Sequence, residues 1–241
     1  MGNASSTLPP VVFLHEGLGS VAMWKGFPAA FCAAHGLAGI VYSRQGYGRS
    51  TPKPADERWG PDFMHRHAFD VLPALLERWG VERPWLFGHS DGGSIALLHA
   101  ARHDVAGVVA VAPHLFVEDV SIASIELARV AFETGELRRR LAKYHDDPDS
   151  AFRGWNDAWL SPAFRSWNIE AEIAAITCPV LAVQGENDEY GSLEQIRAIA
   201  RRLPQTRLLT LPACGHSPHR DCPDTLTREA GRFILEHSPQ N

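Results

Sequence analysis

Short apolar runs alternate with segments of helix length along most of this chain. The runs are rich in β-branched residues, which is typical of buried parallel strands. They span residues 11–14, 39–42, 85–87, 108–111, 180–183 and 207–211. The segments between most of them predict helices at 23–35, 62–79, 91–102, 192–202 and 221–236. This alternation predicts an α/β fold with a doubly wound sheet of about six mostly parallel strands and helices on both faces.

The alternation stops between Pro113 and Thr177, where the sequence keeps a helical periodicity. We therefore expect a helical cap at 114–176, inserted after the fourth strand. A chain of 241 residues fits one α/β domain. The cap would belong to that domain, and residues 1–113 and 177–241 would form its core.

A Gly-x-Ser-x-Gly turn joins the third apolar run to the helix that follows it. It reads Gly88-His89-Ser90-Asp91-Gly92. A serine on a sharp strand-to-helix turn projects its hydroxyl over the sheet only if small residues flank it closely. Ser90 is therefore the candidate nucleophile.

A serine hydroxyl is a poor nucleophile at neutral pH, so it needs a base within reach and an acid that orients the base. The base candidate is His216, which follows the last apolar run. Three acid candidates share the loop after the fifth apolar run, 180–183. They are Glu186, Asp188 and Glu189. All of these residues lie beyond the carboxyl ends of predicted strands, where ligands bind in open α/β sheets.

With these residues the chain resembles the α/β-hydrolase family over most of its length. The order serine, acid, histidine is that of the family. The spacing from Gly185 to Asp188 matches the family's Gly-x-x-Asp and favours Asp188 as the acid, and Gly215-His216 matches its terminal histidine. The resemblance implies a serine hydrolase, a carboxylesterase, that cleaves an ester or related acyl bond through an acyl-enzyme without metal or organic cofactor.

The loop after the first strand is similar to the family's oxyanion loop, with one departure. Many members read His-Gly-x-Gly-Gly-Ser where this chain reads His15-Glu16-Gly17-Leu18-Gly19-Ser20, so Glu16 replaces a glycine. We expect the amides of Gly17 and Asp91 to form the oxyanion hole, and His15 to hydrogen-bond the loop.

Acidic residues beside the nucleophile bear on the substrate. The Gly-x-Ser-Asp-Gly-Gly pattern is similar to that of the valacyclovir hydrolase group, in which an acidic residue here helps to accept amino-acid esters. Asp91 or Glu16 would then pair with a cationic substrate group. The alternative is local, because the helix dipole favours a carboxylate such as Asp91 in the first turn of a helix.

Four further side chains are candidates for the substrate pocket. Trp155 and Trp159 are four residues apart and share a helix face. They either line an apolar pocket or fix the cap to the core. Leu18 lies in the oxyanion loop, and His89 either shapes the pocket or packs beneath the turn.

The amino-acid composition limits the kinds of molecule that this protein is expected to bind. The sequence has 23 Lys and Arg against 28 Asp and Glu, a formal charge of −5, which argues against a nucleic-acid surface. Its four cysteines lack the density of a disulfide framework and indicate free thiols in a reducing compartment. The first ten residues lack the features of a signal peptide. We predict a cytoplasmic protein acting on a small ester-like molecule, with no nucleic-acid or membrane partner; the sequence indicates no oligomeric state.

Other interpretations use some of the same residues. The run from Gly17 to Ala22 satisfies the dinucleotide pattern Gly-x-Gly-x-x-Ala, and Arg44 would meet the 2′-phosphate of NADP, but this leaves Ser90 unexplained. Hydrolysis of carbon–carbon bonds in ring-cleavage products and ligand reception without turnover are further alternatives, since related proteins serve both. A cluster with spacing unusual for zinc consists of Cys214, His216, His219 and Cys222.

Overall fold

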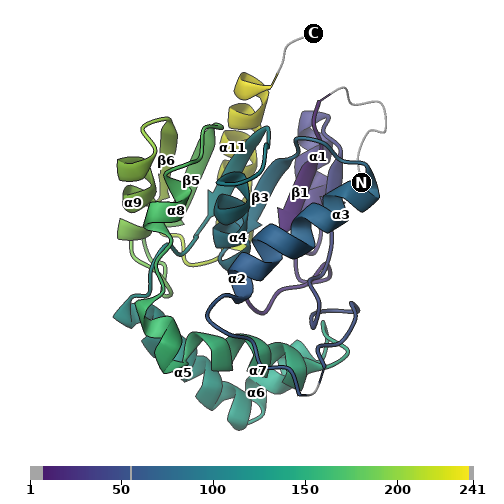
Figure 1. Cartoon of the computed structure of the whole chain (residues 1–241), viewed down its shortest axis with the longest axis vertical. Helices are drawn as coiled ribbons and strands as arrows, with labels where there is room; N and C mark the ends of the chain where they lie inside the picture. Colours follow the sequence, from purple (N-terminus) through teal and green to yellow (C-terminus); the bar gives the residue numbers. More distant parts are fainter. Residues whose placement is uncertain (1–7, 55, 239–241) are drawn as a thin grey trace.

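The computed structural model describes residues 8–54 and 56–238. At its centre lies a sheet of six strands, all parallel, in the order β2-β1-β3-β4-β5-β6 (Figure 1). This confirms the predicted α/β fold, and the strand bounds lie within two residues of the predicted ones. The strands are β1 (Val11–Leu14), β2 (Gly39–Val41), β3 (Trp85–His89), β4 (Gly107–Val111), β5 (Val180–Gly185) and β6 (Thr206–Leu211).

Side chains along the strands alternate between two hydrophobic clusters, one on each face of the sheet. In β1, Val11 and Phe13 belong to one cluster and Val12 and Leu14 to the other. The four central strands are buried along their whole length, which explains their continuous apolar sequences. One cluster includes α1 (Phe27–His35) and α11 (Pro223–His237), and the other includes α3 (Leu72–Trp79), α4 (Asp91–Ala100) and α9 (Glu194–Arg202).

Two predicted helices differ from the observed ones. The helix expected at 62–79 consists of α2 (Phe63–Arg66), a π-helical turn (His67–Val71) and α3. In a regular helix the ring of Pro73 would collide with the carbonyl four residues before it, and the wider turn gives the ring room. The helix expected at 23–35 begins only at Phe27, because Lys25 has a φ of 51°, outside the range of an α-helix.

The long segment between β4 and β5 is helical. Its first three helices lie together beyond the carboxyl ends of the strands, whereas its last one packs on α4 and α9 beside the sheet (Figure 1). The division into a cap at 114–176 and a core stays a prediction. The elements are α5 (Asp119–Glu133), α6 (Glu136–Leu141), α7 (Pro148–Trp159), the 3-10 helix η2 (Pro162–Ser166) and α8 (Glu170–Ile173).

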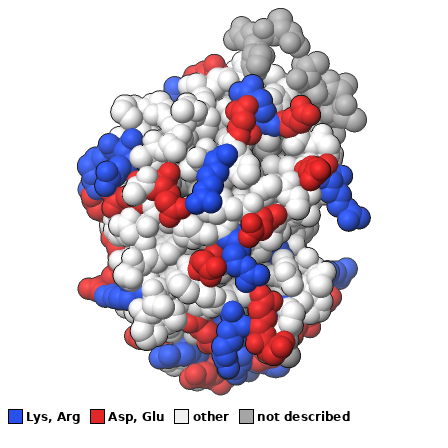
Figure 2. Space-filling model, viewed as in Figure 1, with Lys and Arg blue, Asp and Glu red and all other residues white. Residues whose placement is uncertain are grey.

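The surface mixes charges of both signs. On the face in Figure 2, cationic and anionic side chains are interspersed. Among the described residues, no helix has the length and apolar composition needed to cross a membrane. Most of the amino-terminal stretch used above to predict location, residues 1–7, lies outside the described residues.

Candidate active site

Ser90 sits on a strained turn between β3 and α4. Its backbone angles are φ 54° and ψ −121°, a left-handed conformation that L-residues rarely adopt. Close backbone approach on both sides explains the two flanking glycines. A Cβ on Gly88 would collide with the carbonyl of Gly92, and a Cβ on Gly92 with the carbonyl of Leu14. The turn therefore requires glycine at both positions and holds the Ser90 hydroxyl at the carboxyl end of the sheet.

The structure brings Ser90, His216 and Asp188 into one chain of hydrogen bonds. The distance from Ser90 Oγ to His216 Nε2 is 2.9 Å, and His216 Nδ1 lies 2.9 Å from both carboxylate oxygens of Asp188. Because a carboxylate can only accept, Nδ1 carries the proton and Nε2 is free to accept from the serine hydroxyl. This is the tautomer that a histidine needs to act as base toward Ser90.

Asp188 is held by several donors besides His216. Its Oδ1 accepts from the main-chain N–H groups of Tyr190 and Gly191 at 2.8 and 3.2 Å, and its Oδ2 accepts from Gln184 Nε2 at 2.6 Å. Burial opposes ionisation, but the hydrogen bonds that the carboxylate accepts from His216 and from the Tyr190 main chain hold the pKa of Asp188 below its ordinary value. Asp188 is thus kept as a carboxylate.

The two other acid candidates in this loop do not reach the imidazole of His216. Glu189 Oε2 accepts the main-chain N–H of His216 at 3.1 Å, so it supports the histidine loop. Glu186 is exposed. Of the three carboxylates, only Asp188 contacts the ring.

The predicted oxyanion donors lie on either side of the nucleophile. Gly17 follows β1, and Asp91 is the first residue of α4. In the part of the chain that the structure describes, neither main-chain N–H has an acceptor. Trp155 from α7 packs so closely on Gly17 that a Cβ there would collide with the indole nitrogen. The predicted oxyanion hole would therefore lie beneath that indole.

Two buried histidines fix the oxyanion loop. His15 Nδ1 donates to the Glu16 carbonyl at 2.7 Å, and its Nε2 accepts from the main-chain N–H of Arg44 at 3.0 Å. His145, between α6 and α7, donates from Nε2 to the Leu18 carbonyl and accepts from Gly48 N–H, both at 2.9 Å. Burial lowers the pKa of both histidines, which keeps them neutral. The segment between β4 and β5 thus holds the oxyanion loop through His145.

The Asp91 side chain faces the protein rather than an open pocket. It is fully buried; Oδ1 accepts from Trp159 Nε1 at 3.1 Å, and Oδ2 lies 4.0 Å from the buried guanidinium of Arg44. Burial, opposed by the charge of Arg44, raises the pKa of Asp91 to about 6. Arg44 also donates to the Glu16 carbonyl at 2.8 Å and is buried, so it is not open to a cofactor phosphate.

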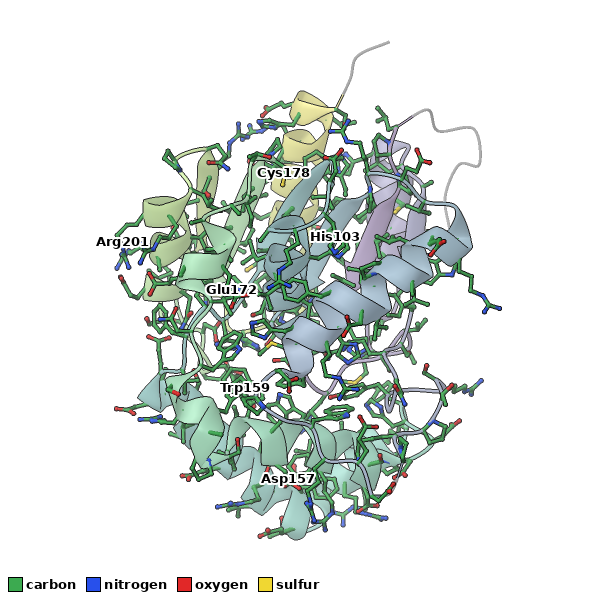
Figure 3. All side chains as sticks on the ribbon, viewed as in Figure 1. His103, Asp157, Trp159, Glu172, Cys178 and Arg201 are labelled. Carbon is green, nitrogen blue, oxygen red and sulfur yellow. The ribbon has the colours of Figure 1, made fainter. Side chains whose placement is uncertain are left out.

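Trp159 joins the helical layer of α5, α6 and α7 to the core (Figure 3). Its side chain is 1% exposed and Trp155 is 6% exposed. The Trp159 indole contacts Asp91, and the Trp155 indole contacts Gly17. Both therefore anchor α7 over Ser90, and Trp155 covers the predicted oxyanion hole.

His114 is a residue of this site that we did not single out from the sequence. It follows β4 closely, at the sheet edge that carries Ser90. Its ring centroid lies 4.9 Å from that of Trp159 and 5.9 Å from that of His216. Burial lowers its pKa to about 3, so it is neutral, and its Nδ1 is buried with no hydrogen-bond partner among the described residues. The sequence feature that could have indicated His114 is its position just after a predicted strand, like that of Ser90.

The cysteine and histidine cluster does not assemble as a metal site. His216 contacts Ser90 and Asp188, and the ring of His219 packs against Trp24 with centroids 4.9 Å apart. The described residues contain no group of three His, Cys, Asp or Glu side chains arranged to hold a metal ion.

Comparison with known proteins gives several relatives. The chain is 24% identical to the bifunctional esterase/perhydrolase of Acinetobacter calcoaceticus, covering 93% of this chain and 91% of that protein. It is 23% identical to the human serine hydrolase BPHL, over 81% of this chain and 68% of the relative. It is also 23% identical to the 2-hydroxymuconate semialdehyde hydrolase of Pseudomonas sp. strain CF600, over 94% and 87% of the two chains.

Solved structures share the fold. The enol-lactonase of Burkholderia xenovorans superposes with a TM-score of 0.75 at 21% identity, covering 97% of this chain and 94% of that one. The proline iminopeptidase of Mycobacterium smegmatis gives a TM-score of 0.76 at 19% identity, covering 95% and 90%. The model of the alpha/beta hydrolase family matches residues 11–229. The chain therefore belongs to the α/β hydrolase family.

Proposed function

We propose that this protein is a serine hydrolase, a carboxylesterase, that cleaves an ester or related acyl bond through an acyl-enzyme. The observation that supports this most directly is the hydrogen-bonded chain from Ser90 through His216 to Asp188. The esterase/perhydrolase and serine hydrolase relatives support the same reaction class. The substrate would be a small molecule.

The proposed mechanism uses side chains and backbone amides alone. His216 Nε2 takes the Ser90 proton as Oγ attacks the acyl carbonyl, and the Gly17 and Asp91 amides donate to the oxyanion that forms. His216 then protonates the leaving alkoxide, and the alcohol departs. Water, deprotonated by the same imidazole, attacks the acyl-enzyme, and the imidazolium then returns the proton to Ser90 Oγ as the bond to the acyl group breaks and the acid departs. Asp188 stabilises the imidazolium in both halves of the cycle.

The proposal is tested by replacing Ser90 with alanine and measuring hydrolysis of a short p-nitrophenyl ester. Ser90→Ala removes the nucleophile, so turnover falls to background while circular dichroism stays that of the wild type. The matched control is Ser166→Ala, an exposed serine of η2. Unchanged turnover in Ser90→Ala would refute the assignment. Mass spectrometry after a fluorophosphonate probe gives a second readout, since only Ser90 should carry the adduct.

Carbon–carbon bond hydrolysis is the second candidate, supported by the relative named 2-hydroxymuconate semialdehyde hydrolase. A ring-cleavage dienolate offered to the wild type distinguishes the two. Loss of dienolate absorbance faster than ester hydrolysis would favour this candidate over a carboxylesterase.

A further inference from the structure

Glu16, the residue that departs from the family's oxyanion-loop pattern, contacts His89, which directly precedes the nucleophile. Glu16 Oε2 lies 3.4 Å from His89 Nδ1. The opposite ring nitrogen, Nε2, lies 2.7 Å from the main-chain carbonyl oxygen of His216. The His89 side chain is 2% exposed and that of Glu16 is 21% exposed. One buried imidazole thus lies between two oxygen atoms that belong to the oxyanion loop and to the histidine loop.

The partners of His89 determine where its protons are. A carbonyl oxygen only accepts, so Nε2 carries a proton that it donates to His216. Burial disfavours the charged form of Glu16, but the hydrogen bond and charge of His89 outweigh it and hold the pKa of this carboxyl below its ordinary value. An ionised carboxylate also only accepts, so Nδ1 must carry a proton as well. His89 satisfies both oxygens only as an imidazolium.

We propose that Glu16 and His89 form a brace that positions the oxyanion loop relative to the catalytic base. The three residues of the brace are each close to a group proposed to act in the reaction. Glu16 directly precedes Gly17, and His89 directly precedes Ser90. The carbonyl that accepts from His89 belongs to His216 itself. Glu16 and His89 are positioning residues that do not touch the substrate. This inference rests on the proposed function and extends it, because it assigns a role to the unusual glutamate.

The brace depends on the proton of His89 Nδ1. Without that proton, Nδ1 and the Glu16 carboxylate would be two acceptors facing each other, and the contact would break. The other groups that face His89 are the rings of His216, His219 and Trp24, with centroids 5.1, 4.8 and 6.3 Å away.

The test compares kcat and KM of the wild type with those of Glu16→Ala and Glu16→Gln. Glu16→Ala removes the brace, so kcat falls about 10- to 100-fold with KM nearly unchanged, as expected for a misplaced donor. In Glu16→Gln the side-chain amide donates to a neutral His89 Nδ1, so the contact and most of kcat are kept. Wild-type kcat in Glu16→Ala, or a kcat in Glu16→Gln as low as that of Glu16→Ala, would overturn the brace.

The chain offers a matched control in a second histidine–glutamate pair. His65 Nε2 lies 3.0 Å from Glu172 Oε1, and Glu172 lies on α8 beside the core (Figure 3). Glu172→Ala and Glu172→Gln should leave kcat and KM unchanged. An equal loss of kcat in Glu172→Ala would show a general loss of stability and would count against the brace.

A readout that needs no substrate separates the brace from the proposed function. The ¹⁵N shifts of the His89 ring should show two protonated nitrogens in the wild type near neutral pH and one in Glu16→Ala. A ring with a bare Nδ1 in the wild type contradicts the brace even if the esterase is active. The opposite outcome is also possible to recognise. If His89 is an imidazolium but Ser90→Ala hydrolyses esters as fast as the wild type, the proposed function is refuted and the pair of Glu16 and His89 stands.

Discussion

The Asp188 carboxylate is the group that keeps the proton of His216 on the nitrogen away from Ser90. Asp188→Asn keeps the size of the side chain but can present its NH₂ group to Nδ1, which favours the wrong tautomer of the ring. We expect kcat for ester hydrolysis to fall about 10³- to 10⁴-fold, with little change in KM. Steady-state kinetics of the variant test this.

Glu186→Gln is the control for Asp188→Asn, since it changes an exposed carboxylate of the same loop. It should retain the activity of the wild type. If kcat fell more in Glu186→Gln than in Asp188→Asn, Glu186 and not Asp188 would be the acid that orients His216.

Asp91 carries a buried charge whose energetic effect depends on pH. Its pKa is raised to about 6 in the folded protein from an ordinary 3.8, so the folded state holds a proton that the unfolded chain has released. As pH rises from about 4 to about 6, this residue lowers the free energy of unfolding by up to about 3 kcal/mol. Asp91→Asn cannot ionise, and its amide oxygen still accepts from Trp159. Its stability relative to the wild type should therefore increase over that pH window.

Urea unfolding of Asp91→Asn and wild type at several pH values measures this difference. Asp157→Asn, on the exposed side of α7, is the control and should show none (Figure 3). A constant difference between Asp91→Asn and wild type across the window would contradict the raised pKa. Because Arg44 already faces Asp91, the structure favours a structural role for this carboxylate over recognition of a substrate cation.

At the scale of elements, α7 and the loop after β1 depend on each other. Gly17 allows Trp155 to lie directly on the oxyanion loop. Gly17→Ala would force the indole away or displace the loop and its N–H donor. We expect a loss of about 100-fold or more in kcat, the effect of removing one oxyanion donor. Kinetics on a short ester measure it.

Gly26→Ala is the matched control for Gly17→Ala, because a Cβ at Gly26 meets no atom within 4 Å. The double variant Gly17→Ala/Trp155→Ala gives the new methyl group room and should recover part of the lost kcat. If the double variant is no better than Gly17→Ala, the collision with the indole is not the cause of the loss.

The sequence predicts local elements better than it predicts their partners. Buried parallel strands need continuous apolar runs, so all six were recognisable. The π-helical turn before Pro73 was expected as regular helix, because its cause is a collision within the helix and not a change in periodicity. His114 could be found from the sequence only by its place just after a strand. The contact of His145 with Leu18 and that of Glu16 with His89 join segments that are distant in sequence. Such contacts are set by tertiary packing, and no spacing along the chain reveals them.

At the scale of the whole molecule, α11 is tied to the centre of the sheet. Trp85 Nε1 in β3 donates to Ser238 Oγ at 3.2 Å, and Ser238 donates in turn to the Ile234 carbonyl at 2.8 Å. Ser238→Ala leaves the buried indole N–H without an acceptor and should lower the free energy of unfolding by about 1 to 3 kcal/mol. Denaturant unfolding measures the loss, and Ser238→Thr, which keeps the hydroxyl, should lose less. Equal stability of Ser238→Ala and wild type would show that the indole has no need of this partner.

The order of strands in space has a consequence for synthesis. Ser90, the proposed nucleophile, follows β3 in the middle of the sheet, whereas His216, the proposed base, follows β6, the last strand in sequence, which lies at the edge. A nascent chain that has folded only as far as β5 holds Ser90 and Asp188 but no imidazole to take the serine proton. In the proposed mechanism, hydrolytic activity therefore begins only after the last strand has left the ribosome and joined the sheet, so no shorter fragment can consume acyl compounds while translation continues.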